Sequence, residues 1–234
     1  VELLCRNVDG ARQLADELVA CTAENEFPYW RAFAWAVHGW ARVCDGELQA
    51  GIAELERARA VHREMGAGLL STHFLCWLAE GRMRAGEIAA GLAAVDDGLL
   101  LTETTLDCSY RPELWRLKGE LCLAQAGGEG SNASAARADD SKVQRARARQ
   151  DRAAAAGRAE DCFRRALETA RETQARSLEL RAATSLARWL QRSRKNSDAR
   201  ALLGEICQWF GPDATSPDLS DARALLQQLS PAAR

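Results

Sequence analysis

One pattern of large apolar, small and glycine residues occurs twice in this chain at a spacing of about 40 residues. The two copies consist of Trp35, Gly39, Gly46, Gly51, Leu55 and Ala58, and of Leu75, Ala79, Gly86, Gly91, Val95 and Gly98. Small residues allow two helix backbones to approach closely, and a glycine between the helices allows a tight turn. The pattern therefore predicts pairs of antiparallel helices, and a series of such pairs predicts an all-α solenoid.

Two altered copies of the pattern are expected further along the chain. In the third unit a first helix begins at Arg111-Pro112, and the second helix contains residues 159–167. In the fourth unit the helices contain residues 180–190 and 199–206, and no glycine lies between them. A serine, a proline and an aspartate at 216–218 are typical of a helix start, so a final short helix is expected to cap the last apolar face.

The third unit is interrupted by an insertion, residues 127–157. Its first part, 127–141, is rich in Gly, Ser, Asn, Ala and Asp and predicts a disordered loop. Its second part is rich in Arg and Ala, which favours a helical extension with few large apolar residues to pack. The chain thus divides into residues 1–126 (a partial unit, two complete units and the first helix of the third), the flexible insertion 127–157, and residues 158–234 (the remaining helices and the cap).

Composition argues for a folded protein without affinity for polyanions. Hydrophobic residues make up 47% of the chain, charged residues 27%, and the formal net charge is −2, which favours neither direct nucleic-acid binding nor a membrane surface. No apolar run reaches the roughly 20 residues of a membrane span and no signal peptide opens the sequence, so a cytoplasmic location is expected. The sequence begins at Val1 within helical pattern, which suggests a piece of a longer protein. Its eight cysteines include no Cys-x-x-Cys pair and are expected to be reduced thiols in the core.

Two segments resemble the tetratricopeptide repeat (TPR), in which a first helix carries Trp-x-x-Leu-Gly and a second carries Ala-x-x-x-Phe-x-x-Ala. Residues 115–119 match the first motif with Lys118 at the leucine position, and residues 159–167 match the second. Trp35 and Gly39 repeat the spacing of the first motif. The resemblance implies a right-handed solenoid of antiparallel helix pairs, although units of about 40 residues exceed the usual 34.

Several longer phrases are similar to the C-terminal repeat region of large bacterial signalling proteins. They are residues 39–41, 114–121, 175–183, 185–188 and 215–219. In that family an adenylate/guanylate cyclase domain or a winged-helix DNA-binding domain precedes a P-loop ATPase module, and the repeats follow. The resemblance implies a non-catalytic protein-interaction or regulatory module of a cyclase or transcriptional regulator, whose partner is a protein, a peptide or the upstream domains of the same chain.

Motifs for catalysis do not occur in the sequence. There is no Gly-Lys dipeptide for a phosphate-binding loop, no Gly-x-Ser-x-Gly elbow and no His-Glu-x-x-His zinc motif. We therefore expect no catalytic residues, cofactor or metal in this chain. Two alternatives to the interaction module stay open: a self-association scaffold, active as a homodimer, that positions upstream catalytic domains, and a fragment of a nucleotide-handling enzyme whose active site lies outside the chain.

The family geometry places the inner residues of each first helix in a concave groove. The expected partner-binding residues are Trp40, His73, Glu80, Arg116, Glu120, Arg181 and Arg188. Such a groove is apolar near Trp40 and arginine-rich near Arg188, which suits an extended peptide or helix with an apolar anchor and a carboxylate-bearing end.

The histidines and tryptophans also allow plainer interpretations. His38 is expected near the core and His62 in solvent. For His73 the sequence leaves open whether the side chain faces the concave groove. The tryptophans at 35, 77, 115 and 189 recur at packing positions, so core burial is favoured over a ligand cage.

Overall fold

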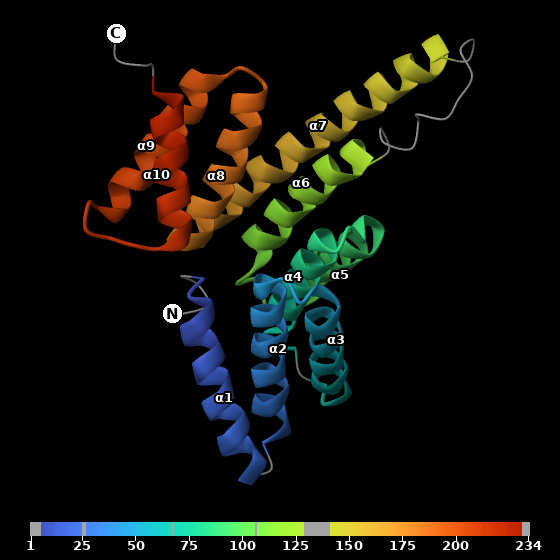
Figure 1. The fold of residues 1–234 in the computed structure, drawn as a ribbon, viewed down its shortest axis with the longest axis vertical. Coiled ribbons are helices and arrows are strands. Elements are labelled where there is room, and N and C mark those ends of the chain that lie inside the picture. The colour runs from blue at the N-terminus through green and yellow to red at the C-terminus, as the bar shows by residue number, and fades with distance from the viewer. Residues whose placement is uncertain (1–5, 25–26, 67, 106, 129–140, 231–234) are drawn as a thin grey trace.

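The computed structural model describes residues 6–24, 27–66, 68–105, 107–128 and 141–230, and within these ranges every regular element is an α-helix. The helices run α1 Val8–Glu24, α2 Pro28–Asp45, α3 Leu48–Glu64, α4 Ser71–Arg84, α5 Ile88–Thr104, α6 Arg111–Gly128, α7 Ser141–Glu172, α8 Arg176–Arg192, α9 Asn196–Phe210 and α10 Pro217–Leu229 (Figure 1). The prediction of an all-α protein is confirmed for this part of the chain.

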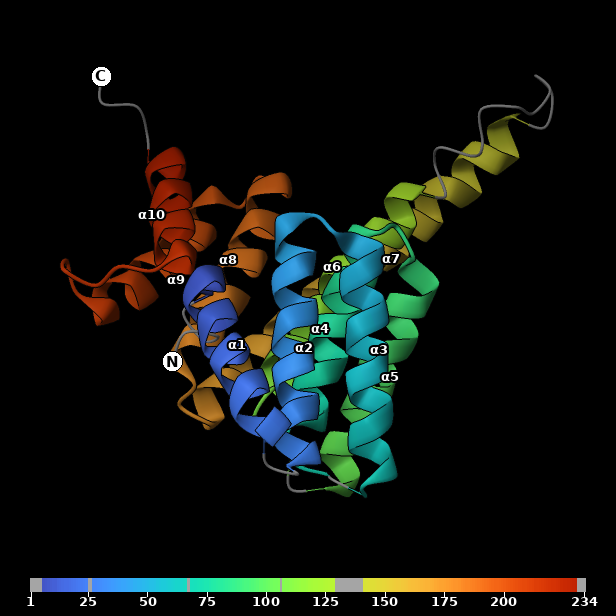
Figure 2. The same ribbon diagram turned by 60° about the horizontal axis from the view of Figure 1, so that its bottom comes forward.

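Helices adjacent in sequence pack against each other, and so do the even-numbered helices from α2 to α10. The pairs α2–α3, α4–α5, α6–α7 and α8–α9 are each in contact, and α2, α4, α6 and α8 each touch the next of that set. Figure 2 shows α1, α2 and α3 lying side by side. The helices α2, α4, α6 and α8, called the A helices below, therefore form one continuous row.

The turns use the residues that the pattern marks for them. Gly46 after α2 and Gly86 after α4 have φ of 92° and 79°, in the left-handed region that favours glycine. In the fourth unit, where no glycine is present, Arg194 adopts φ of 60° instead. At the last helix the hydroxyl of Ser216 accepts a hydrogen bond from the backbone N–H of Leu219 at 3.2 Å, which confirms the expected N-cap.

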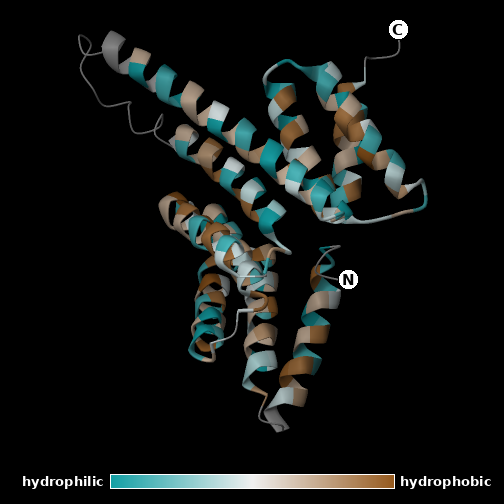
Figure 3. Ribbon diagram, turned by 180° about the vertical axis from the view of Figure 1, so that it is seen from behind, coloured by the Kyte–Doolittle hydropathy of each residue, from teal (hydrophilic) through white to brown (hydrophobic). Residues whose placement is uncertain are grey.

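The core consists of two clusters that share a border. One joins α1 to α6 and the other joins α6 to α10, and Leu92 and Trp115 pack against both. Hydrophobic and hydrophilic segments alternate along the helices in Figure 3, as amphipathic helices require. Four of the described cysteines are buried, namely Cys76, Cys122, Cys162 and Cys207. Within the described residues, no helix combines the length and apolar character that crossing a membrane requires.

The helical part of the insertion is continuous with the second helix of the third unit. That helix, α7, runs unbroken from Ser141 to Glu172, so it begins 17 residues before position 158, and its first turns extend beyond the end of α6 (Figure 1). Alanine and arginine are strong helix formers, which explains a long helix with little core to pack against. The expected disordered loop falls mostly on residues 129–140, which lie outside the described residues.

The tryptophans of the A helices differ in environment. Trp77 is buried in the core, whereas Trp35, Trp115 and Trp189 are only partly buried. Each of these three lies beneath a cation: Arg57 at 4.0 Å, Arg165 at 4.9 Å and Lys195 at 5.5 Å from the ring centroid, respectively. The cation covers part of each tryptophan ring that helix packing leaves exposed.

The expectation that His62 is solvated is wrong. Its side chain is 2% exposed and lies between the rings of Tyr29 and Phe74, at centroid distances of 5.0 and 4.9 Å. The last turns of α3 pack against α4, so a late position in this helix is an interior one. Burial lowers the pKa of His62 accordingly.

Candidate functional site

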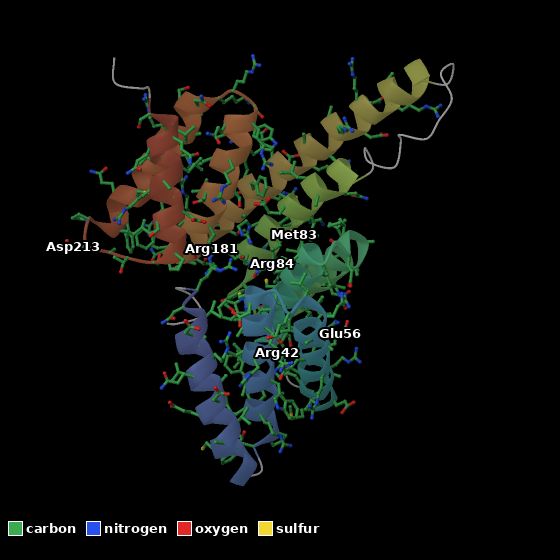
Figure 4. The ribbon with its side chains drawn as sticks, viewed as in Figure 1. Arg42, Glu56, Met83, Arg84, Arg181 and Asp213 are labelled. Atoms are coloured by element: carbon green, nitrogen blue, oxygen red, sulfur yellow. The ribbon has the colours of Figure 1, made fainter. Side chains whose placement is uncertain are left out.

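The inner faces of the A helices converge on a cluster of charged and aromatic side chains. Arg6, Trp40, Trp77, Glu80, Tyr110, Glu113 and Arg181 line one small, nearly filled pocket together with Cys76. The charged members come from the segment before α1 and from α4, α6 and α8. Figure 4 labels Arg84 and Arg181, which lie where these helices meet.

Glu80 is held between two guanidinium groups. Its Oε1 lies 2.5 Å from Arg6 Nη2 and 3.1 Å from Arg84 Nη2. Arg84 also donates through Nη1 to the carbonyl oxygen of Val43 at 3.1 Å, which ties α4 to α2. Burial alone would raise the pKa of Glu80, but Arg6 and Arg84 outweigh burial and lower it. This carboxylate is therefore ionised and neutralised within the fold.

A second charged group surrounds Glu113. Arg116 donates to both carboxylate oxygens of Glu113, at 3.0 and 2.8 Å. Arg181 lies 4.0 Å from the same carboxylate and donates through Nε to Asp218 of α10 at 2.7 Å. Burial would raise the pKa of Glu113, but the two guanidiniums lower it to about 2. These contacts connect α6, α8 and α10.

Charge balance in the cluster depends on Arg6. The carboxylates are those of Glu80, Glu113, Glu120 and Asp218, and the guanidiniums contributed by the helices are those of Arg84, Arg116 and Arg181. Arg6, which precedes the first helix, supplies the fourth positive charge. Without it, the helices would present one carboxylate more than guanidiniums.

An open groove adjoins this cluster. It has a volume of about 640 Å³ and is lined by Phe33 of α2, the start of α4, the residues just before α6, the α7–α8 turn with the first turn of α8, and the end of α9. Its aromatic side chains are Phe33, His73, Tyr110, Trp209 and Phe210. Tyr110 lines both the groove and the filled pocket, so the two spaces are neighbours along one face.

His73 forms one wall of the groove. Its ring stacks on Tyr110 with centroids 3.7 Å apart and meets Trp77 edge-on at 6.1 Å. Its Nδ1 is buried and has no hydrogen-bond partner among the described residues. Burial lowers the pKa of His73 to about 4, so the ring is neutral at pH 7.

The end of α9 forms another part of the groove wall. Trp209 is 58% exposed and meets Phe210 edge-on at 4.9 Å. The guanidinium of Arg176 lies over the Trp209 ring at 5.1 Å and pairs with Glu179 at 2.6 Å. An exposed tryptophan held in one orientation by its neighbours is typical of a contact surface.

The residues expected in the groove have three different environments. Glu80, Arg116, Glu120 and Arg181 belong to the charged cluster, where Ser185 joins Glu120 with a 2.7 Å hydrogen bond. Trp40 is 2% exposed and packs on Trp77 beside the cluster, and His73 lines the open groove. Arg188 lies apart from both on an exposed face, 3.5 Å from Asp221.

Four further residues of the site were not expected from the sequence. Arg6 carries no signal of its own, and Asp218 marks only a helix start, because the charged partners of both residues are distant in the chain. Tyr110 precedes the Arg111-Pro112 helix start, and Trp209 forms an aromatic pair at a helix end. Tyr110 and Trp209 both lie at helix boundaries, and residues at such boundaries often line binding grooves.

Among the residues that the structure describes, no three His, Cys, Asp or Glu side chains are grouped so that they could hold an ion.

The chain matches no known protein-family model, and no curated protein sequence matches it significantly.

Proposed function

We propose that the chain is a TPR-like helical-repeat interaction module of a multidomain bacterial signalling protein, and that its aromatic groove binds an extended peptide segment. The resemblance of residues 115–119 and 159–167 to the repeat motifs supports the first part. The row of A helices in mutual contact is compatible with a right-handed solenoid of such units.

The observation that carries the peptide-binding proposal is that His73 and the exposed Trp209 line the same open groove. His73 contributes an uncharged aromatic ring to the lining, and Trp209 offers an exposed apolar face. An apolar side chain of the peptide can pack against Trp209, Phe33 and the neutral ring of His73. The expected carboxylate end has less support, because Arg116 and Arg181 are already engaged with carboxylates.

Selection of binders from a library of displayed random peptides tests this function. Recovered peptides are synthesised, and their Kd is measured by fluorescence anisotropy against the parent chain and the Trp209→Ala and His73→Ala variants. We expect each substitution to weaken binding at least about tenfold, as at an interface hot spot. Leu14→Ala is the matched control, because Leu14 is an exposed apolar residue on α1, away from the groove. A selection that yields no binder, or binders indifferent to both groove variants, would contradict the proposal.

Self-association is a second candidate, favoured by a separate observation. Phe27, Trp30 and Leu69 are 51%, 49% and 64% exposed, and Tyr29 bridges the two segments through a 3.4 Å hydrogen bond to the Leu69 carbonyl. Clustered exposed apolar residues mark interaction surfaces. Light scattering after size exclusion tests this candidate: a dimer that Trp30→Glu converts to a monomer supports it, and a monomer at all concentrations excludes it.

A further inference from the structure

We propose that Glu80, Trp40, Trp77 and Tyr110 form a pocket for a guanidinium group, which Arg6 fills from the chain's own N-terminal segment and an arginine of a bound peptide fills in the complex. The part concerning the peptide rests on the function proposed above. The pocket itself does not, and it is tested separately.

Arg6 reaches the pocket from outside the helices. It precedes α1, is 74 residues from Glu80 in sequence, and contacts the row of A helices through its side chain. Its φ is 54°, in the left-handed region that residues other than glycine adopt only at an energetic cost. Placing this side chain in the pocket therefore requires an unfavourable backbone conformation at Arg6. The ion pair with Glu80 offsets that conformational free energy.

The electrostatics of the pocket favour a cation. Glu80 has a side chain only 9% exposed, and without Arg6 the ion pair that it keeps is the one with Arg84 on its own helix. Burial alone would lower the pKa of Arg6, but Glu80, Glu113 and Asp218 together raise it. Three carboxylates from α4, α6 and α10 thus attract whatever positive group occupies the position of Arg6.

The walls of the pocket favour a guanidinium over an ammonium group. Trp40, Trp77 and Tyr110 line it, and with Arg6 in place about 10 Å³ of free space remains. A planar guanidinium packs against aromatic faces and is weakly hydrated, whereas an ammonium is a compact, strongly hydrated charge. The pocket therefore matches arginine in both shape and desolvation cost.

Tyr110 connects this pocket to the open groove. Because the same ring lines both spaces, a peptide in the groove that places an arginine beside its apolar anchor can reach Glu80. Such an arginine must displace Arg6, since the pocket has no room for two guanidiniums. The N-terminal segment is therefore an intramolecular competitor, and release of Arg6 accompanies binding.

Small-molecule binding to the Arg6→Ala variant tests the pocket directly. Calorimetric titration compares N-acetyl-argininamide with N-acetyl-lysinamide on the parent chain, Arg6→Ala and the double variant Arg6→Ala/Glu80→Gln. We expect Arg6→Ala to bind the arginine derivative at least tenfold more tightly than the parent chain does, and more tightly than the lysine derivative. The double variant is expected to lose this gain. Arg12→Ala, which removes an arginine of α1 paired with Asp45, is the matched control and should behave as the parent.

Thermal unfolding keeps the test decisive if Arg6→Ala is destabilised. In that case the arginine derivative should restore part of the lost melting temperature and the lysine derivative should not. Equal effects of the two derivatives, or equal binding by the parent chain and Arg6→Ala, would overturn the proposal. Selected peptides that depend on Trp209 but bind Arg6→Ala no better than the parent would refute displacement alone and leave the groove function standing. Binding of the arginine derivative to Arg6→Ala, together with a selection that yields no peptide, would support the guanidinium pocket and contradict the groove function.

Discussion

Gly39 of α2 and Gly51 of α3 face each other so closely that neither position has room for a side chain. A β-carbon on Gly39 would lie 2.8 Å from the carbonyl oxygen of Gly51, and one on Gly51 would lie 2.6 Å from the carbonyl oxygen of Gly39. Contacts this short with backbone atoms cannot be relieved by a side-chain rotation. The two helices must therefore separate if either glycine is replaced.

Gly51→Ala is expected to destabilise the protein by about 2 kcal/mol, because the clash outweighs the roughly 1 kcal/mol by which alanine favours a helix. The control is Gly204→Ala in α9, where a β-carbon meets nothing within 4 Å. That variant should be stabilised by about 0.5–1 kcal/mol. Urea unfolding measures both, and changes of the same sign would refute the close approach of α2 and α3.

Stability is expected to fall in acid through Glu113. The pKa of this group is about 2 in the folded protein and near the ordinary 4.5 in the unfolded chain, so the unfolded state takes up the proton first. The contribution of Glu113, on the order of 3 kcal/mol, is complete above pH 4.5 and is lost as pH falls toward 2. Urea titrations across this range should show a steeper loss in the parent than in Glu113→Gln. Parallel curves would contradict the assignment.

His73 is expected to titrate near pH 4, because burial disfavours its charged form. Protonation of the unfolded chain near pH 6.5 then removes stability progressively between 6.5 and 4, with full stability above 6.5. Ring ¹⁵N NMR, with the His73 signal identified by its loss in His73→Asn, gives the midpoint. A midpoint near 6.5 would mean that the ring is solvated.

Asp218→Asn is expected to loosen α10. This change weakens the 2.7 Å pair with Arg181, which is buried, and should cost about 2 kcal/mol. Asp221→Asn on the same helix affects only the exposed pair with Arg188 and should cost about 0–1 kcal/mol. Hydrogen exchange of residues 217–229 should rise in the first variant and change little in the second. Similar exchange in the two variants would show that the Arg181 contact does not hold α10.

The helix pairs could be predicted because their determinants are local. Gly46 and Gly86 mark turns by backbone conformation, and Ser216 marks a helix start by a hydrogen bond three residues away. His62 was misplaced because its burial depends on how α3 meets α4, and the sequence of α3 alone does not specify that contact. The helical extension that the Arg- and Ala-rich residues 142–156 predicted is present in α7, because helix propensity extends a helix where packing does not require it.

The candidate site was predictable only in part. Inner positions of the A helices could be assigned, and the structure brings Glu80, Arg116, Glu120 and Arg181 into one cluster. Their partners could not be assigned, because Arg6 and Asp218 come from segments far away in sequence. Pairing of charges across such separations depends on the curvature of the helix row, and no local pattern records that curvature.

The ion pairs of Arg6 with Glu80 and of Asp218 with Arg181 affect how the protein unfolds. Stacked helix pairs that touch mainly their neighbours tend to fray one unit at a time from either end. Here a residue near the start of the chain and one in the last helix join a single charged cluster in the middle. Loss of an end unit therefore exposes an unbalanced charge at the centre, which makes unfolding more concerted at neutral pH. Protonation of Glu80 and Glu113 in acid should restore the unit-by-unit fraying that these contacts suppress.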